Sequence, residues 1–80
     1  MDIRLQVGIN VRRARQHKAW SQEDLAFECG LHRTYISGIE RGVRNPTVLI
    51  LAKIADALGV EPSGLFKSDS KHRRLSRSPG

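Results

Sequence analysis

Two short apolar segments separated by a glycine constrain the fold of this chain more than any other feature. Residues 22–41 read QEDLAFECGLHRTYISGIER, and their apolar and small residues have the spacing of two short helices that cross at a steep angle. The positions expected to be buried are Leu25, Ala26, Cys29, Leu31, Ile36 and Ile39. Ala26 is small where the helices come closest, and Gly30 stands where the first helix ends and positive φ is favoured. The sequence therefore predicts two helices joined by a tight turn.

The flanking residues predict an all-α domain of five helices. Val7, Val11 and Ala14 recur with helical spacing, and Ser21 with Asp24 forms a capping pattern before the second helix. The expected helices cover about 3–18, 22–29, 32–41, 48–58 and 62–66. The alternation of apolar and polar residues that is typical of strands is absent.

The fourth helix should be held to the core by an apolar stripe of five residues. These are Val48, Leu51, Ala52, Ala55 and Leu58. Thr47 is the expected N-cap and Gly59 the expected end of this helix. Pro62 suits the first turn of the last helix, Leu65 and Phe66 should close the core, and Trp20 should cover it.

Composition indicates one basic domain followed by a tail. The 80 residues carry a net charge of +6, of which residues 67–80 supply +4 from five basic residues and one acidic residue. We therefore expect a domain over 1–66 and a disordered basic tail over 67–80. The single cysteine, Cys29, excludes an intrachain disulfide and is interpreted as a core residue. No apolar run approaches the ~20 residues that cross a membrane, and no secretory signal is visible, so we expect a cytoplasmic protein.

Residues that carry catalysis or bind metals do not cluster in this sequence. His17, His32 and His72 are isolated, and Cys29 has an apolar context. Metal-ligand spacings, nucleophile–base pairs and phosphate-cradling glycine loops are absent from the sequence. We expect no catalytic residue, no metal and no cofactor, and hence a protein that is not an enzyme.

The segment from about Ile9 to Phe66 resembles the Cro/C1-type helix-turn-helix domains, also called the XRE family. The resemblance is carried by VRRAR, SQEDLA, GLHRTYISGIERG, NPT and LAKIADALGV in this order. Within that family, RTYISGIERGVRN is similar to the controller proteins of restriction–modification systems, which are small dimeric regulators. The resemblance implies a compact lambda-repressor-like fold. His32 departs from the usual polar cap of the helix that enters DNA.

A helix in the major groove presents its N-terminal outward side chains to base edges. The residues expected to contact bases are His32, Arg33, Thr34, Ser37 and Gly38. Arg33 is suited to a bidentate contact with guanine, and its alternatives are a phosphate contact or a solvated charge. The residues expected to contact phosphates are Gln22, Tyr35, Arg41, Arg44 and Asn45. Because Gly38 lacks a side chain, part of the specificity is expected to come from DNA shape.

Two further assignments concern stability and assembly. The resemblance implies that Arg15 and Glu40 form a structural ion pair between the first and third helices. The helix over 48–58 is more apolar than a small monomer can bury, which indicates a dimer surface. Its expected residues are Leu49, Ile50, Val60, Pro62 and Leu65. A two-fold dimer implies a roughly palindromic operator.

The leading hypothesis is a sequence-specific transcriptional regulator that binds double-stranded operator DNA as a homodimer. RNA polymerase is a candidate second partner, because such a regulator either blocks or recruits it. The alternative is an antitoxin or adaptor-type protein-interaction module of the same fold. A third hypothesis, an RNA-associated protein, depends only on the Ser/Arg content of the tail.

Overall fold

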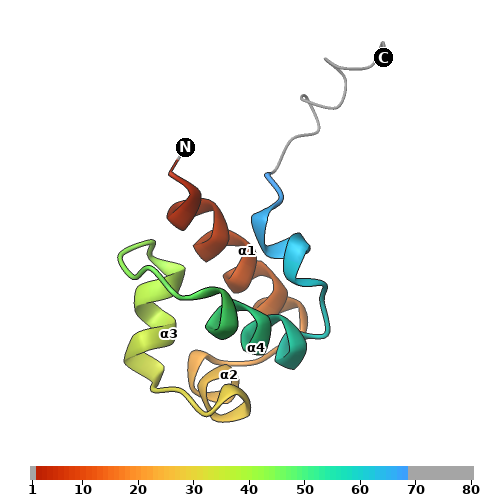
Figure 1. Ribbon diagram of the computed structural model, residues 1–80. Coiled ribbons are helices and arrows are strands. Elements are labelled where there is room, and N and C mark those ends of the chain that lie inside the picture. The colour runs from red at the N-terminus through yellow and green to blue at the C-terminus, as the bar shows by residue number, and fades with distance from the viewer. Residues whose placement is uncertain (1, 69–80) are drawn as a thin grey trace.

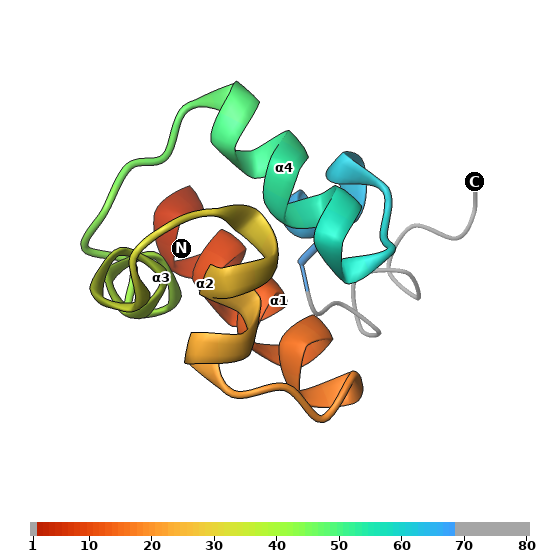
Figure 2. The same ribbon diagram turned by 90° about the horizontal axis from the view of Figure 1, so that it is seen from below.

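The computed structural model describes residues 2–68 as four α-helices and one short 3-10 helix. These are α1 (Ile3–His17), α2 (Gln22–Cys29), α3 (Arg33–Glu40), α4 (Val48–Leu58) and η1 (Pro62–Phe66). The long helix α1 packs against α3, η1 and α4, and α2 packs against α3 and α4 (Figures 1 and 2). Residues 2–68 contain no strand, which confirms the all-α prediction.

The expected fifth α-helix is a 3-10 helix instead. Its five residues, PSGLF, are too few for a regular α-helix of ordinary length, and they include a proline and a glycine. The other helices lie within one residue of their predicted bounds. Helix α1 ends at His17, and α3 covers 33–40 with Arg41 as its C-cap.

The predicted helix caps are present. Ser21 Oγ accepts a hydrogen bond from Asp24 N at 3.0 Å, and the Asp24 carboxylate accepts one from Ser21 N at 2.8 Å. Thr47 Oγ1 accepts from Ile50 N at 3.1 Å at the start of α4. Gly30 ends α2 in the left-handed region at φ 70°, where side chains with a Cβ are strained. Local chemistry therefore sets the ends of α2 and α4.

One apolar core joins all five elements. Its buried residues are Val7, Val11, Leu25, Ala26, Cys29, Ile36, Ile39, Leu51, Ile54, Ala55, Leu58 and Leu65. The six residues predicted to hold α2 and α3 together all belong to this core or pack against it, with Leu31 only partly buried. Trp20 also packs against the core from the connection before α2, as expected.

The predicted inner stripe of α4 is wrong at two positions. Val48 is 79% exposed and Ala52 is exposed, whereas Ile54 is fully buried. The stripe that faces the core is Leu51, Ile54, Ala55 and Leu58. Because α4 is apolar on several sides, two stripes with the same helical spacing were available, and only packing against α1, α2 and η1 selects one. Phe66 is also misassigned, since it is 45% exposed while Leu65 fills the core.

Gly8 sets the close approach of α1 to α3. A methyl group at this position would collide with the backbone carbonyl oxygens of Ile39 and Glu40. The two helix backbones therefore touch where a larger residue would hold them apart.

The structure describes only Lys67 and Ser68 of the predicted basic tail. The tail remains a prediction over 69–80, which lies outside the described residues together with Met1. Within the described residues, none of the helices has the length and apolar character required to cross a membrane.

Candidate nucleic-acid interface

Helix α3 presents one face to the core and the opposite face to solvent. Ile36 and Ile39 are buried, and the outward residues include Arg33, Thr34 and Arg41, all exposed. His32 is exposed at the N-cap and makes no side-chain capping bond. Ser37 is partly exposed and lies one turn before Arg41, whose Nε is 3.4 Å from Ser37 Oγ. The outward face of α3 is thus polar and positively charged.

The acidic residue of α3 is turned away from that face and into an ion pair. Arg15 donates from Nε to Glu40 Oε2 at 2.7 Å and from Nη2 to Glu40 Oε1 at 2.9 Å. Arg15 Nη1 also donates to the carbonyl oxygen of Trp20 at 2.8 Å. The two side chains are only 12% and 4% exposed, and the bonds to Glu40 raise the pKa of Arg15. The expected pair is therefore present, and it neutralises Glu40 beneath the surface.

Gln22 takes part in the same network, which the sequence did not indicate. Its side-chain Nε2 donates to Glu40 Oε1 at 3.1 Å, so the amide points inward from the start of α2. The backbone N–H groups of Gln22 and Glu23 and the second hydrogen of the amide are the donors left for a phosphate, since the N–H of Asp24 already donates to Ser21. The position of Gln22 is thus set by an ion pair that joins α1 to α3.

Gly38 is not the outward, base-contacting residue that the sequence predicted. It is buried, and the side chain of Arg44 lies over it. The Arg44 guanidinium lies 5.7 Å from the ring centre of the half-buried Tyr35. Asn45 follows in the exposed loop. Arg44 therefore covers the surface that the sequence assigned to Gly38.

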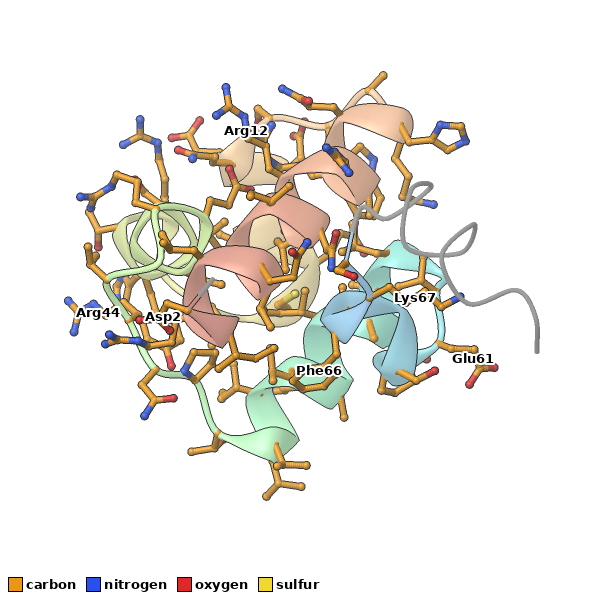
Figure 3. All side chains as sticks on the ribbon, turned by 90° about the horizontal axis from the view of Figure 1, so that it is seen from above. Asp2, Arg12, Arg44, Glu61, Phe66 and Lys67 are labelled. Carbon is orange, nitrogen blue, oxygen red and sulfur yellow. The ribbon has the colours of Figure 1, made fainter. Side chains whose placement is uncertain are left out.

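Arg44 and the residues after α4 lie on different sides of the molecule. Figure 3 shows Arg44 beside α3, whereas Glu61 and Lys67 lie beyond α4 and η1.

Of the five residues expected at a dimer surface, Leu49 is 78% exposed and Pro62 is exposed. Ile50 and Val60 are partly buried against the core. Leu65 is only 1% exposed, so its assignment to an interface is wrong because the monomer already buries it.

Two residues that the sequence analysis missed hold these surfaces in place. Gly8 brings α3 against α1, as described above, and a glycine inside an expected helix was the available signal. Asn10 Nδ2 donates to the carbonyl oxygens of Leu65 at 2.8 Å and Lys67 at 2.7 Å. The sequence feature that could have indicated this role is the position of Asn10, an amide one turn after Val7 on the apolar side of α1. Asn10 thus fastens η1 and the chain after it to α1.

Cys29 is buried, and burial raises the pKa of its thiol, as expected of a core residue. Over residues 2–68 the structure contains no group of three or more His, Cys, Asp or Glu side chains that is arranged to hold a metal ion. The outward side of α3 offers hydrogen-bond donors and positive charge.

Comparison with known proteins identifies relatives with this architecture. A family model described as helix-turn-helix (HTH_3) matches residues 11–65. Control protein C.BamHI of Bacillus amyloliquefaciens is 57% identical over 66 residues, which cover 81% of this chain and 82% of that protein. The restriction–modification controller protein C.AhdI from Aeromonas hydrophila superposes with a TM-score of 0.76 at 44% identity, over 79% of this chain and 96% of that one. The controller protein C.Esp1396I, solved as a tetramer with its natural 35 base-pair operator, gives a TM-score of 0.74 at 39% identity, over 82% and 87% of the two chains.

Proposed function

Because this chain belongs to the helix-turn-helix family HTH_3, of the Cro/C1 or XRE type, we propose that it is a sequence-specific, DNA-binding transcriptional regulator. One observation carries the proposal. The outward side of α3 and the loop after it carry Arg33, Arg41 and Arg44, all exposed, while the carboxylate of Glu40 is paired inside. A face of this charge attracts a polyanion and leaves its donors available to it.

The dimensions of α3 suit the major groove of duplex DNA. An α-helix with its side chains is about 10–12 Å in diameter, and the groove is about 12 Å wide. In this position Arg33 donates two hydrogen bonds to a guanine, with His32, Thr34 and Ser37 beside neighbouring bases. The contacts proposed to the phosphates come from Gln22, Tyr35, Arg41, Arg44 and Asn45. No base contact is proposed for Gly38, because the Arg44 side chain covers it.

A homodimer completes the proposal. Leu49 and Val48, 78% and 79% exposed, are apolar side chains at the start of α4, and Ile50, Val60 and Pro62 continue the proposed surface. A two-fold dimer places two recognition helices about 34 Å apart, so its operator is roughly palindromic. C.Esp1396I is a relative crystallised as a tetramer on its operator, which supports oligomeric binding here.

The similarity to C.BamHI and C.AhdI supports a controller role in a restriction–modification system. In this role the dimer occupies promoter DNA in the cytoplasm and acts by blocking or recruiting RNA polymerase. The proposal includes no enzymatic step, since binding to the promoter is sufficient for regulation.

Selection of bound duplexes from a random library, at about physiological salt, tests this function. The proposal predicts recovery of a palindromic site whose half-sites lie about one helical turn apart. A Leu49→Asp variant, which places a charge in the proposed dimer surface, should sediment as a monomer and lose the palindrome. Recovery of no sequence preference, with binding that depends only on salt, would reject the proposed function.

A further inference from the structure

We propose that Gly38 is a positioning residue, whose missing side chain lets Arg44 lie across α3 against Tyr35 and present its guanidinium to the DNA backbone. The inference rests on the proposed function and deepens it. It replaces a base contact at Gly38 with an arginine that reaches this part of α3 from the following loop.

The backbone brings Arg44 to this place. The carbonyl oxygen of Gly38 accepts hydrogen bonds from Val43 N at 3.0 Å and from Arg44 N at 3.3 Å. The chain after α3 therefore turns back onto the helix. These two bonds hold the backbone of Arg44 next to Gly38, before any side-chain contact is considered.

The Arg44 side chain then occupies the space that a Cβ at Gly38 would need. A methyl group built at Gly38 would lie 2.5 Å from Arg44 Cγ, 3.2 Å from its Nε and 3.4 Å from its Cδ. Carbon atoms do not approach so closely, so any other residue at position 38 displaces the arginine. The conflict is with a flexible, exposed side chain, so the helix itself can accept an alanine there.

The ring of Tyr35 lies near the guanidinium end of the Arg44 side chain. Tyr35 lies one turn before Gly38 on α3, and its ring centre is 5.7 Å from the Arg44 guanidinium. A guanidinium against an aromatic face is attracted to the ring while its N–H groups remain available at its edges. Arg44 is thus directed along α3 in the free protein, which reduces the side-chain ordering that DNA binding requires.

The competing role for Gly38 is that the glycine only allows the DNA backbone to come close to α3. The two roles differ in whether the effect of a methyl group depends on Arg44. If the glycine positions Arg44, the methyl has nothing further to disturb once Arg44 is absent. If the glycine makes room for DNA, the methyl is harmful with or without the arginine.

A double-mutant cycle on the full chain separates them. The affinities of wild type, Gly38→Ala, Arg44→Ala and the double variant are measured by fluorescence anisotropy. The probe is one duplex recovered in the wild-type selection, at several salt concentrations. We expect each single variant to bind about tenfold more weakly and to lower the salt slope by about one counterion. The double variant should bind no more weakly than Arg44→Ala.

Two controls accompany the cycle. Arg12→Ala removes an exposed arginine of α1 that has no proposed DNA contact, and it should keep the wild-type salt slope (Figure 3). Thermal melting of Gly38→Ala should show a protein at least as stable as wild type, because alanine favours a helix more than glycine does. Weaker binding by that variant then cannot come from unfolding.

NMR of the free protein gives a readout that does not involve DNA. The Tyr35 ring should shift the side-chain protons of Arg44, and this shift should disappear in Gly38→Ala. The positioning role is overturned if the shift persists, if Gly38→Ala binds like wild type, or if the methyl weakens binding equally without Arg44. A wild-type protein that binds no duplex would instead refute the proposed function.

Discussion

Replacement of Arg15 by alanine tests how the interior supports the DNA-facing helix. In wild type, Glu40 accepts two hydrogen bonds from Arg15, at 2.7 and 2.9 Å, and one from Gln22 at 3.1 Å. Its side chain is 4% exposed, so it is largely shielded from water in the folded protein. Arg15→Ala leaves a carboxylate that is buried and bonded only to an amide.

The magnitude follows from that burial. Removal of one partner from a buried ion pair destabilises a protein by about 3–5 kcal/mol. Because Gln22 still donates to Glu40, we expect the lower end of that range, about 3 kcal/mol. The free energy of unfolding for a domain of this size is roughly 3–10 kcal/mol, so the variant is close to the limit of folding. Its midpoint of thermal unfolding should fall by about 12–24 °C.

The assay is urea unfolding followed by circular dichroism, with thermal melts alongside. Arg4→Ala is the matched control, because it breaks a surface pair with Asp2 whose side chains are 46% and 39% exposed. That control should keep the wild-type midpoint, since the Asp2 carboxylate can still cap the backbone N–H of residue 4. If Arg15→Ala loses less than about 1 kcal/mol, the pair behaves as a surface pair and the reasoning from burial is refuted.

Three further predictions concern packing elsewhere in the domain. Gly8→Ala should lower the melting temperature sharply, because the added methyl meets two carbonyl oxygens of α3. In the control variant Gly64→Ala the added methyl has no such neighbour within 4 Å, so the melting temperature should stay near that of wild type. Equal melting temperatures of the two variants would contradict this. Asn10→Ala should destabilise by about 1–3 kcal/mol in urea unfolding, because two carbonyl oxygens near η1 lose their donor, and an unchanged midpoint would show that water replaces the amide. The Cys29 thiol is buried and its pKa is raised, so it should react with a thiol reagent far more slowly in the native protein than in urea, and rapid native labelling would contradict its burial. Because the pKa of this thiol is higher in the folded than in the unfolded protein, the free energy of unfolding should decrease as the pH rises into the range where an exposed thiol ionises.

Local signals in the sequence predicted the helices and the pairing of α2 with α3. Ser21, Thr47 and Gly30 act on residues within one turn, so their effect is readable without the rest of the fold. Of the six positions predicted to be buried between 25 and 39, all but Leu31 in the turn lie on the buried faces of α2 and α3. For these reasons the sequence predicted the bounds of the α-helices to within one residue.

Features that depend on distant contacts were not predictable in the same way. Helix α4 is apolar on several sides, so its periodicity permitted a stripe through Val48 and Ala52 as well as the stripe through Ile54 that the core buries. Gly38 was interpreted as an outward, base-contacting residue, because nothing nearby in sequence shows that Arg44 returns across it. The choice between such readings is made by tertiary packing.

The position of Arg33 gives the most direct test of how this protein reads DNA. Base preferences across the selected site are compared for wild type and Arg33→Ala, with circular dichroism to show that the variant is folded. The account predicts that preference falls by about 1–3 kcal/mol at one symmetry-related pair of guanines and is kept at the other positions. Uniform weakening at every position, or an unchanged preference profile, would contradict the placement of α3 in the major groove.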